Sequence, residues 1–313
     1  MTQTAERPTS IQPFRVFGAE VLRVHRLSPS FLRVTFTGPD LGQFADNGYD
    51  QRIKLILPLP ETGLTEMPPG PDWYARWRAL PPERRNPIRT YTVRAVRAEV
   101  AEVDVDLVLH GDGGPAARWA VAARPGSIAG LFGPVAGYSG VHGGLEFHPP
   151  ARTDRLLLAG DETAVPAICS ILERLPADAV GEVVLEVPES GDSLPVSGPS
   201  GVDVTWLARN GAAHGSQLVP AVRDAARRLR AGTPTPTAAV ELEDVDVDTD
   251  ILWEVPDDGA ETPQTDGGDL YAWLAGEAGV VKTLRRQLVG EYGMDRRAVA
   301  FMGYWRLGRT EQN

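Results

Sequence analysis

The pattern of the chain changes near residue 150, and this change constrains the fold more than any other feature. Before it, apolar and polar residues alternate over short segments such as 14–23, 31–37 and 102–110, which glycines and prolines separate. Alternation of this kind predicts half-buried strands, and several short strands in succession favour an antiparallel barrel. Segment 58–87 carries eight prolines, so we expect a long loop there.

After residue 150, apolar strand patterns alternate with helical ones. This alternation predicts a doubly wound parallel sheet. Because 313 residues are too many for one ordinary core, we expect two domains, a barrel over 1–150 and an α/β domain over 151–313. The expected strands are 155–159, 182–187, 202–207, 251–255, 270–274 and 298–304, and the expected helices are 163–175, 216–229 and 277–292.

Composition excludes several classes of protein. The single cysteine, Cys169, rules out a disulfide framework and a cysteine-rich metal site, and we expect no protein metal ligands. A formal net charge of −11 argues against nucleic acid as a partner. There is no signal-peptide pattern and no apolar run long enough to span a bilayer, so we expect a cytoplasmic monomer without membrane insertion.

Two motifs in the first half suit a flavin dinucleotide. Arg89, Tyr91 and Thr92 open a strand and offer a cation, an aromatic face and a hydroxyl. About twenty residues later a glycine-rich turn leads into a helix that begins at Pro115, where free amides can meet a pyrophosphate. The alternatives are an ordinary strand with an exposed arginine and a plain turn. The candidate residues in the turn and helix are His110, Gly113, Gly114, Ala116, Ala117 and Trp119.

Three motifs in the second half follow predicted strands, where an open α/β sheet binds ligands. The turn Asp161-Glu162-Thr163 is the first, although these residues also make ordinary helix caps and no G-x-G-x-x-G is present. Arg209 stands where it could pair with a 2′-phosphate, which predicts a preference for NADPH; the alternative is an exposed loop arginine. Around the last two strands the candidates are Trp273, Ala275, Gly276, Glu277, Tyr304, Trp305 and Arg306.

A basic helix face adds a possible anion pocket. Lys282, Arg285 and Arg286 follow the strand end at Glu277, and a solvated basic face is the alternative. Lys54 lies inside the apolar run 53–57, so its ammonium must point out of the core or into a polar cavity.

These segments, in this order, resemble the siderophore-interacting protein family of ferric-siderophore reductases, within the ferredoxin-reductase-like superfamily. The resemblance implies a barrel that binds FAD and an α/β domain that binds NADPH or NADH. It places Arg89, Tyr91 and Thr92 at the flavin ring and phosphates, with His110, Gly114, Ala116 and Trp119 along the rest of FAD. It places 161–163 before the flavin, Trp273 and 275–277 beside the nicotinamide, and 304–306 over the flavin or its adenine.

The resemblance also implies the reaction, in which NAD(P)H reduces the flavin and the flavin reduces Fe(III) held by a siderophore. Lys54 and Lys282 are then the expected contacts to the anionic siderophore, with Arg285, Arg286 or Arg306 as further contributors. Three alternatives stay open: reduced ferredoxin as the donor, a siderophore-binding protein with little turnover, and a ferric reductase without siderophore preference. Two departures stand out, a long acidic 231–269 region and Ala275-Gly276-Glu277 in place of the superfamily's Cys-Gly motif.

Overall fold

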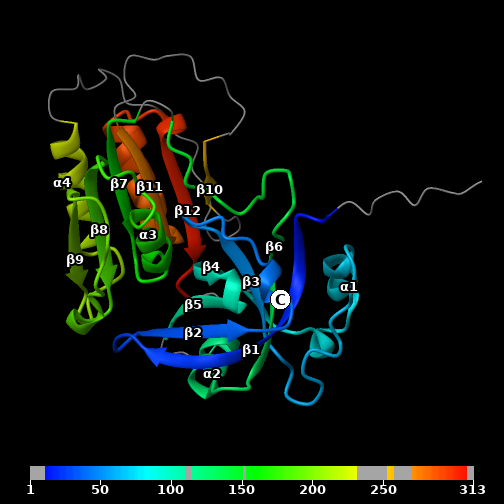
Figure 1. Ribbon diagram of the computed structural model, residues 1–313. Coiled ribbons are helices and arrows are strands. Elements are labelled where there is room, and N and C mark those ends of the chain that lie inside the picture. The colour runs from blue at the N-terminus through cyan, green and yellow to red at the C-terminus, as the bar shows by residue number, and fades with distance from the viewer. Residues whose placement is uncertain (1–10, 110–113, 151–152, 231–251, 257–269, 309–313) are drawn as a thin grey trace, which may run out of the picture.

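The computed structural model describes residues 11–109, 114–150, 153–230, 252–256 and 270–308 (Figure 1). Its first part is a closed barrel of six strands in the order β1-β2-β5-β4-β3-β6, and every neighbouring pair is antiparallel. The predicted barrel is therefore confirmed. The strands are β1 (Phe14–Arg26), β2 (Phe31–Thr37), β3 (Arg52–Ile56), β4 (Ile88–Arg97), β5 (Glu102–Val108) and β6 (Ile128–Pro134).

Strict alternation along β5 shows why these residues form a barrel. Val103, Val105 and Leu107 point inward and are fully buried in the barrel core. Asp104 and Asp106 lie on the other face, where each accepts two hydrogen bonds from a single arginine, Arg97 or Arg33. Charged residues thus cover the outer face while the apolar set fills the interior.

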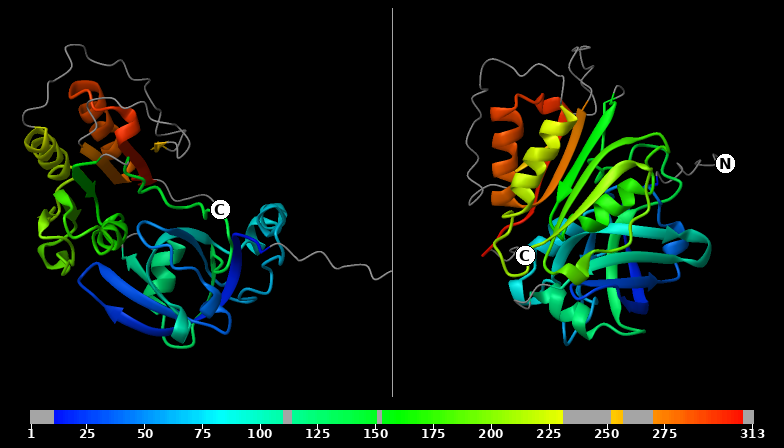
Figure 2. Two further views of the ribbon diagram at one scale, coloured as in Figure 1. Left: turned by 45° about the horizontal axis from the view of Figure 1, so that its top comes forward. Right: turned by 90° about the vertical axis from the view of Figure 1, so that its left-hand side faces the viewer.

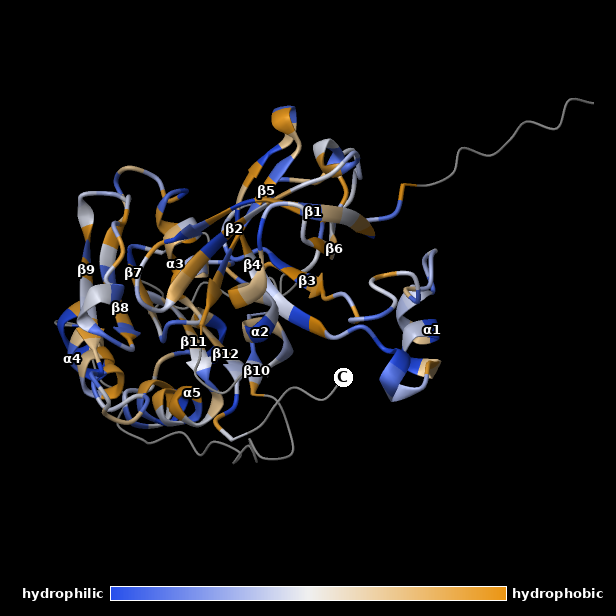
Figure 3. Cartoon of the chain, turned by 90° about the horizontal axis from the view of Figure 1, so that it is seen from below, coloured by the Kyte–Doolittle hydropathy of each residue, from blue (hydrophilic) through white to orange (hydrophobic). Residues whose placement is uncertain are grey.

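The proline-rich segment 58–87 contains a helix that the sequence did not predict, α1 (Trp73–Ala79). Trp73 and Trp77 are buried against Ile56 on the outside of the barrel, and this apolar contact stabilises so short a helix. Seen from below, α1 lies at the edge of the barrel away from the α/β domain (Figure 3). A second helix, α2 (Pro115–Ala122), packs Ala116 and Ala120 onto the barrel core and begins at the predicted proline.

The second part is a six-stranded sheet in the order β10-β12-β11-β7-β8-β9. All pairs are parallel except β10–β12, which is antiparallel, so the sheet is mixed at one edge rather than wholly parallel. The strands are β7 (Arg155–Gly160), β8 (Val180–Val187), β9 (Gly201–Ala208), β10 (Trp253–Glu254), β11 (Leu270–Glu277) and β12 (Val299–Trp305).

Helices cover both faces of this sheet, which confirms the doubly wound arrangement. α3 (Val165–Leu172) packs on one face, and α4 (Leu218–Leu229) and α5 (Ala278–Arg285) lie side by side on the other (Figure 2). Short 3-10 turns at 41–43, 82–84, 98–100, 190–192 and 296–298 complete the described elements. None of the helices in the described ranges has the length and hydropathy needed to cross a bilayer.

Several predicted boundaries in the α/β domain are wrong by a few residues, and three of them have a clear physical reason. The strand expected to end at residue 274 continues as β11 to Glu277, because Ala275–Glu277 pair with β12 as well. The helix expected over 277–292 is α-helical only to Arg285 and then becomes a π-helix over Arg286–Glu291. The helix expected from residue 163 begins at Val165, because Thr163 and Ala164 form a turn bonded to Asp161.

Asp192 joins the two domains. It follows β8, is fully buried, and accepts hydrogen bonds from the Ser28 hydroxyl at 2.6 Å, the Ser30 amide at 2.7 Å and the Ser30 hydroxyl at 2.9 Å. The two serines form the turn between β1 and β2, so one carboxylate fixes the end of a barrel hairpin. Ion pairs from Arg94 to Glu173 and from Arg174 to Asp46 cross the same boundary.

We predict that Asp192→Ala lowers the free energy of unfolding by about 2–4 kcal/mol, because it leaves the buried Ser30 groups without an acceptor. Urea unfolding followed by tryptophan fluorescence measures this. Asp203→Ala, at an exposed position on β9, is the matched control and should change stability by less than about 0.5 kcal/mol. Equal urea midpoints for the two variants would contradict this role for Asp192.

Candidate functional site

Strand β4 carries the first set of candidate residues. Strand alternation places Arg89 and Tyr91 on one face and Thr92 on the other. Tyr91 packs in the same apolar cluster as α2, whereas Thr92 is buried and lies opposite Arg52 of β3. The Tyr91 ring therefore packs against the barrel core, strand alternation puts Arg89 on the same face of β4, and the threonine lies on the opposite face.

Lys54 lies opposite Thr90 on the outer face of the barrel. Its side chain is exposed, and its Nζ donates to Thr90 Oγ1 at 2.7 Å. The sequence prediction that this ammonium points away from the core is confirmed.

The N-terminus of α2 is open within the part of the chain that the structure describes. Gly114 is its N-cap residue, no side chain caps the helix, and a Cβ added to Gly114 would meet nothing within 4 Å. Ala116 and Ala117 stand in the first turn, where uncapped amides attract phosphate. These features fit the pyrophosphate of FAD. The half-buried Trp119 ring stacks on Phe36 at 6.0 Å, and His110 and Gly113 lie outside the described residues.

The α/β domain contributes its carboxyl edge, the edge at which the five parallel strands end. Figure 1 shows β12, in red, running toward the barrel, so this edge of the sheet faces the barrel domain. Asp161 follows β7 here and is 2% exposed. Its Oδ2 accepts from the Glu277 amide at 2.7 Å and from Trp305 Nε1 at 2.8 Å, and its Oδ1 accepts from the Thr163 amide and hydroxyl. Burial, and then the neighbouring charge of Glu162, raise the pKa of Asp161 to about 7.

Gly276 shows how closely the strands approach at this point. Its φ is +150°, and a Cβ there would lie 2.7 Å from Asp161 Oδ2. Only glycine fits without moving that carboxylate. Trp273 and Ala275 are buried in the sheet, with Trp273 Nε1 donating to Asp50, so their side chains belong to the core and do not face a ligand.

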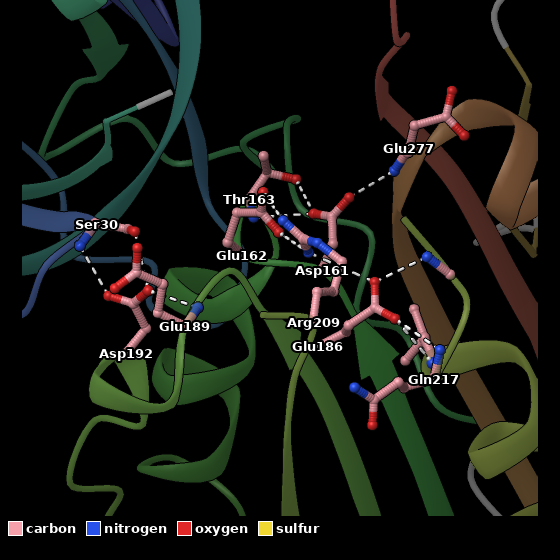
Figure 4. A network of polar contacts seen from close by, with 12 residues as sticks. Ser30, Asp161, Glu162, Thr163, Glu186, Glu189, Asp192, Arg209, Gln217 and Glu277 are labelled. Carbon is pink, nitrogen blue, oxygen red and sulfur yellow. Dashed lines mark hydrogen bonds and ion pairs between the residues drawn. The ribbon is translucent and has the colours of Figure 1, made fainter. Parts of the chain in front are cut away.

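Arg209 is not the exposed loop arginine that the sequence left open as the alternative to a 2′-phosphate contact. It is 7% exposed, and its two terminal nitrogens donate to Glu162 at 2.6 and 2.8 Å (Figure 4). Glu186 lies 3.5 Å from the same guanidinium. The arginine compensates two buried carboxylates, and a phosphate would have to displace one of them.

The three basic residues of the predicted helix face differ in burial and in ion pairing. Arg285 is buried and pairs with Glu254 of β10 at 2.6 Å, so it stabilises the sheet edge and does not line an anion pocket. Lys282 is half-buried on α5, and Arg286 is exposed at the start of the π-helix. Arg306 lies 3.4 Å from Glu277 Oε1.

Two aromatic residues end β12. Tyr304 stacks on Trp253 at 5.9 Å, and its buried hydroxyl has no hydrogen-bond partner among the described residues. Burial holds the pKa of Tyr304 well above its usual range. Trp305 contacts the ring of His214 edge to face at 4.9 Å. An unpaired buried hydroxyl marks a place where a polar ligand group would be stabilised.

Several residues of this region gave no signal in the sequence. Arg52 lies over the Trp253 ring at 4.3 Å and pairs with Glu146, and His214 meets Trp305 only through the fold. One ligand atom each of Asp161, Glu162 and His214 lies within 4.8 Å of the others. Hydrogen bonds from Thr163, Trp305 and Arg209 already occupy the two carboxylates, so this group carries no metal assignment.

Trp305→Phe should destabilise the protein more at pH 8 than at pH 5. The raised pKa of Asp161 means that the folded state binds a proton that the unfolded state lacks, so the free energy of unfolding falls as pH rises from about 4 to about 7. Above pH 7 the carboxylate is charged and depends most on the indole donor, whose loss costs about 1.5–3 kcal/mol.

Urea unfolding at both pH values and at one FAD concentration measures the difference. The matched control is Trp77→Phe, because Trp77 Nε1 donates to the neutral backbone carbonyl of Asn86. The free energy of unfolding that this substitution removes should therefore not change with pH. A loss that is the same at pH 5 and pH 8 for Trp305→Phe would contradict the coupling to Asp161.

Known proteins cover the chain from end to end. The family model described as siderophore-interacting FAD-binding domain matches residues 20–138, and the one described as siderophore-interacting protein matches residues 153–308. Ferric vibriobactin reductase ViuB of Vibrio cholerae is 33% identical over 94% of this chain and 90% of its own length. An uncharacterized protein of Mycobacterium tuberculosis is 34% identical over 96% of this chain and 93% of its own.

Solved structures agree with the sequence relatives. A siderophore utilization protein from T. fusca has a TM-score of 0.70 and 28% identity, covering 97% of both chains. The siderophore-interacting protein SipS from Aeromonas hydrophila has a TM-score of 0.65 and 28% identity, covering 96% of this chain and 94% of its own. A ferredoxin NADP+ reductase from Neisseria gonorrhoeae, at 12% identity and a TM-score of 0.53, shares the fold. The chain belongs to the siderophore-interacting protein family, and its first half matches that family's FAD-binding domain.

Proposed function

We propose that this protein is a cytoplasmic ferric-siderophore reductase that takes electrons from NAD(P)H and releases Fe(II). The observation that carries the proposal is the start of α2, which no side chain of the described residues caps, in a barrel that the carboxyl edge of the α/β domain faces. ViuB, a relative over nearly the whole length, is a ferric vibriobactin reductase by name. FAD, when bound, supplies two-electron chemistry toward a nicotinamide and one-electron chemistry toward Fe(III).

In this proposal the residues of the chain orient the cofactor and compensate the charge of its pyrophosphate. The Arg89 guanidinium and the amides at the start of α2 can neutralise a pyrophosphate, and the Tyr91 ring offers a flat apolar surface beside them. Tyr304 offers a buried hydroxyl at the opposite domain. The aromatic stack of Tyr304 on Trp253 excludes water from that side.

The ferric ligand requires local positive charge. Siderophore oxygens prefer the harder Fe(III), so reduction weakens the complex and allows Fe(II) to leave. The net charge of −11 repels an anionic chelate over long distances, and exposed cations must hold it at contact range. Lys54 and Lys282 remain our candidates, with Arg286 and Arg306 as weaker ones. Arg285 is withdrawn because Glu254 already pairs with it.

A second donor has specific support. The carboxyl edge holds Asp161, Glu162, Glu186 and Glu277, all buried, which is an unfavourable surrounding for the phosphates of a dinucleotide. Reduced ferredoxin, which needs no phosphate site, is therefore the alternative source of electrons.

The proposal predicts that FAD co-purifies with the protein without a covalent bond. After anaerobic reduction of the flavin, addition of a ferric siderophore should restore the oxidised flavin spectrum and release iron to a ferrous chelator. Protein that cannot be reconstituted with FAD would overturn the proposal. Bound flavin without iron release would indicate a siderophore-binding protein with little turnover.

Lys54→Ala and Lys282→Ala should each raise the apparent KM for an anionic ferric chelate by roughly tenfold, the loss of a charge-assisted contact of about 1.4 kcal/mol. FAD content and the rate of flavin reduction should stay near wild type. Arg227→Ala, which removes an exposed cation from α4, is the control and should leave the KM unchanged. A lysine variant that loses FAD, or that keeps the wild-type KM, would contradict the assignment of that lysine.

A further inference from the structure

At the start of α4 the backbone amides donate hydrogen bonds to a carboxylate of the chain itself, that of Glu186. Glu186 lies at the end of β8, fully buried, with its side chain directed into the turn before α4 (Figure 4). Its Oε1 accepts from the Gln217 and Leu218 amides at 3.0 Å each, and its Oε2 accepts from the Gly215 amide at 2.8 Å. These amides are the groups that bind phosphate at a helix N-terminus.

At the junction between β11 and α5 a carboxylate likewise accepts a hydrogen bond from an amide at the start of the helix. Glu277 is the N-cap of α5, and its Oε2 accepts from the Val280 amide at 2.9 Å. Its Oε1 accepts from the Leu307 amide at 3.2 Å and lies 3.4 Å from Arg306.

The junction between β7 and α3 holds two acids. Asp161 accepts a hydrogen bond from the Thr163 amide at 2.9 Å, and Glu162 accepts one from the Arg209 guanidinium. β7 and β11 are neighbours from which the chain proceeds in opposite directions across the sheet, so their carboxyl ends form the topological switch point. A doubly wound sheet binds dinucleotides at this point.

We call these four carboxylates, of Asp161, Glu162, Glu186 and Glu277, the acidic edge cluster. At the starts of α4 and α5 a pyrophosphate would have to displace Glu186 or Glu277, and a displaced buried carboxylate loses its compensating bonds. At the start of α3, which no side chain of the described residues caps, it would lie beside the buried Asp161 and Glu162. It would also lie among like charges in a region where water screens poorly. Among the described residues, Arg209 pairs with Glu162 and Glu186, and Arg306 pairs with Glu277. The starts of α2 and α3 have no side-chain cap within the described ranges, and at α3 two buried acids of the cluster lie beside the helix start.

We infer that the α/β domain gives no binding free energy to the pyrophosphate or adenosine of a nicotinamide donor, which is therefore selected by its nicotinamide end alone. The inference rests on the proposed function and refines it by naming the part of the donor that the protein uses. It replaces the expected NADPH preference, because Glu162 holds the one arginine placed to read a 2′-phosphate.

Binding tests the inference without turnover. The FAD-loaded protein is titrated calorimetrically with ADP-ribose and with its 2′-phosphorylated form, which carry the adenosine and pyrophosphate without nicotinamide. We expect no saturable binding below about 1 mM. A dissociation constant in the micromolar range would overturn the inference.

Kinetics provide the second measurement. Anaerobic flavin reduction is followed with NADH, NADPH and reduced nicotinamide mononucleotide, and we expect second-order rate constants within about threefold of one another. A dinucleotide that reacts about a hundredfold faster than the mononucleotide would overturn the inference. Absence of reaction with all three leaves the titration to decide.

Replacing Glu162 should create a binding site for the 2′-phosphate that the wild-type protein lacks. Glu162→Gln removes one acid and releases the Arg209 guanidinium, so 2′-phospho-ADP-ribose should bind at least about tenfold more tightly than to wild type. The matched control is Glu182→Gln on the same strand as Glu186, which breaks an exposed two-bond pair with Arg228 away from the carboxyl edge. No gain in a folded Glu162→Gln protein would refute the charge argument. If that variant does not fold, the wild-type titration and kinetics still decide.

A separate experiment distinguishes a failure of the proposed reductase function from a failure of the inference about the donor. Flavin reduced by light, without any nicotinamide, is mixed with a ferric siderophore and a ferrous chelator. Failure at this step refutes the reductase proposal and leaves the donor inference to the ADP-ribose titration. Iron release here, together with tight ADP-ribose binding, refutes only the donor inference.

Discussion

The carboxylate of Asp161 holds together the part of the molecule on which the site depends. It follows β7, receives the backbone of β11 through the Glu277 amide, and receives the end of β12 through the Trp305 indole. Because Gly276 has no Cβ, β11 can pass against the carboxylate closely enough for these bonds to form. The position of the terminal aromatic residues thus depends on a single buried acid, whose raised pKa shows how much its ionisation costs.

The two domains use helix N-termini in opposite ways. In the barrel domain no side chain of the described residues caps the start of α2, whose N-cap is a glycine. In the α/β domain Glu186 and Glu277 accept hydrogen bonds from amides at the starts of α4 and α5, and Asp161 accepts from the Thr163 amide in the turn before α3. The same helix dipole that attracts phosphate also stabilises a carboxylate, so an internal acid can stabilise the fold and remove the ligand site at once.

Sequence periodicity predicted the architecture because both domains obey it locally. The alternation of Val103, Val105 and Leu107 with two aspartates is readable without tertiary information, and so is the strand–turn–helix pattern at Asp161. Arg209 and Arg285 show the limit of this reasoning. Each was read as a candidate ligand contact, yet their partners Glu162 and Glu254 lie tens of residues away in sequence. Burial and long-range pairing decide whether an arginine is available, and neither is encoded in local spacing.

The same limit applies to the aromatic residues, and it changes how the site is understood. Trp119, Trp273 and Trp305 each stood in a motif that suggested a ring facing a cofactor. Trp119 stacks in the barrel core and Trp273 is buried in the sheet, while Trp305 keeps a partly exposed ring and uses its indole nitrogen to bind Asp161. A motif therefore does not tell whether its aromatic ring packs in the core or stays partly exposed. Because the Trp305 indole nitrogen donates to Asp161, a displacement of the Trp305 ring would also disturb that carboxylate, which couples the electrostatic state of the carboxyl edge to the position of the end of β12.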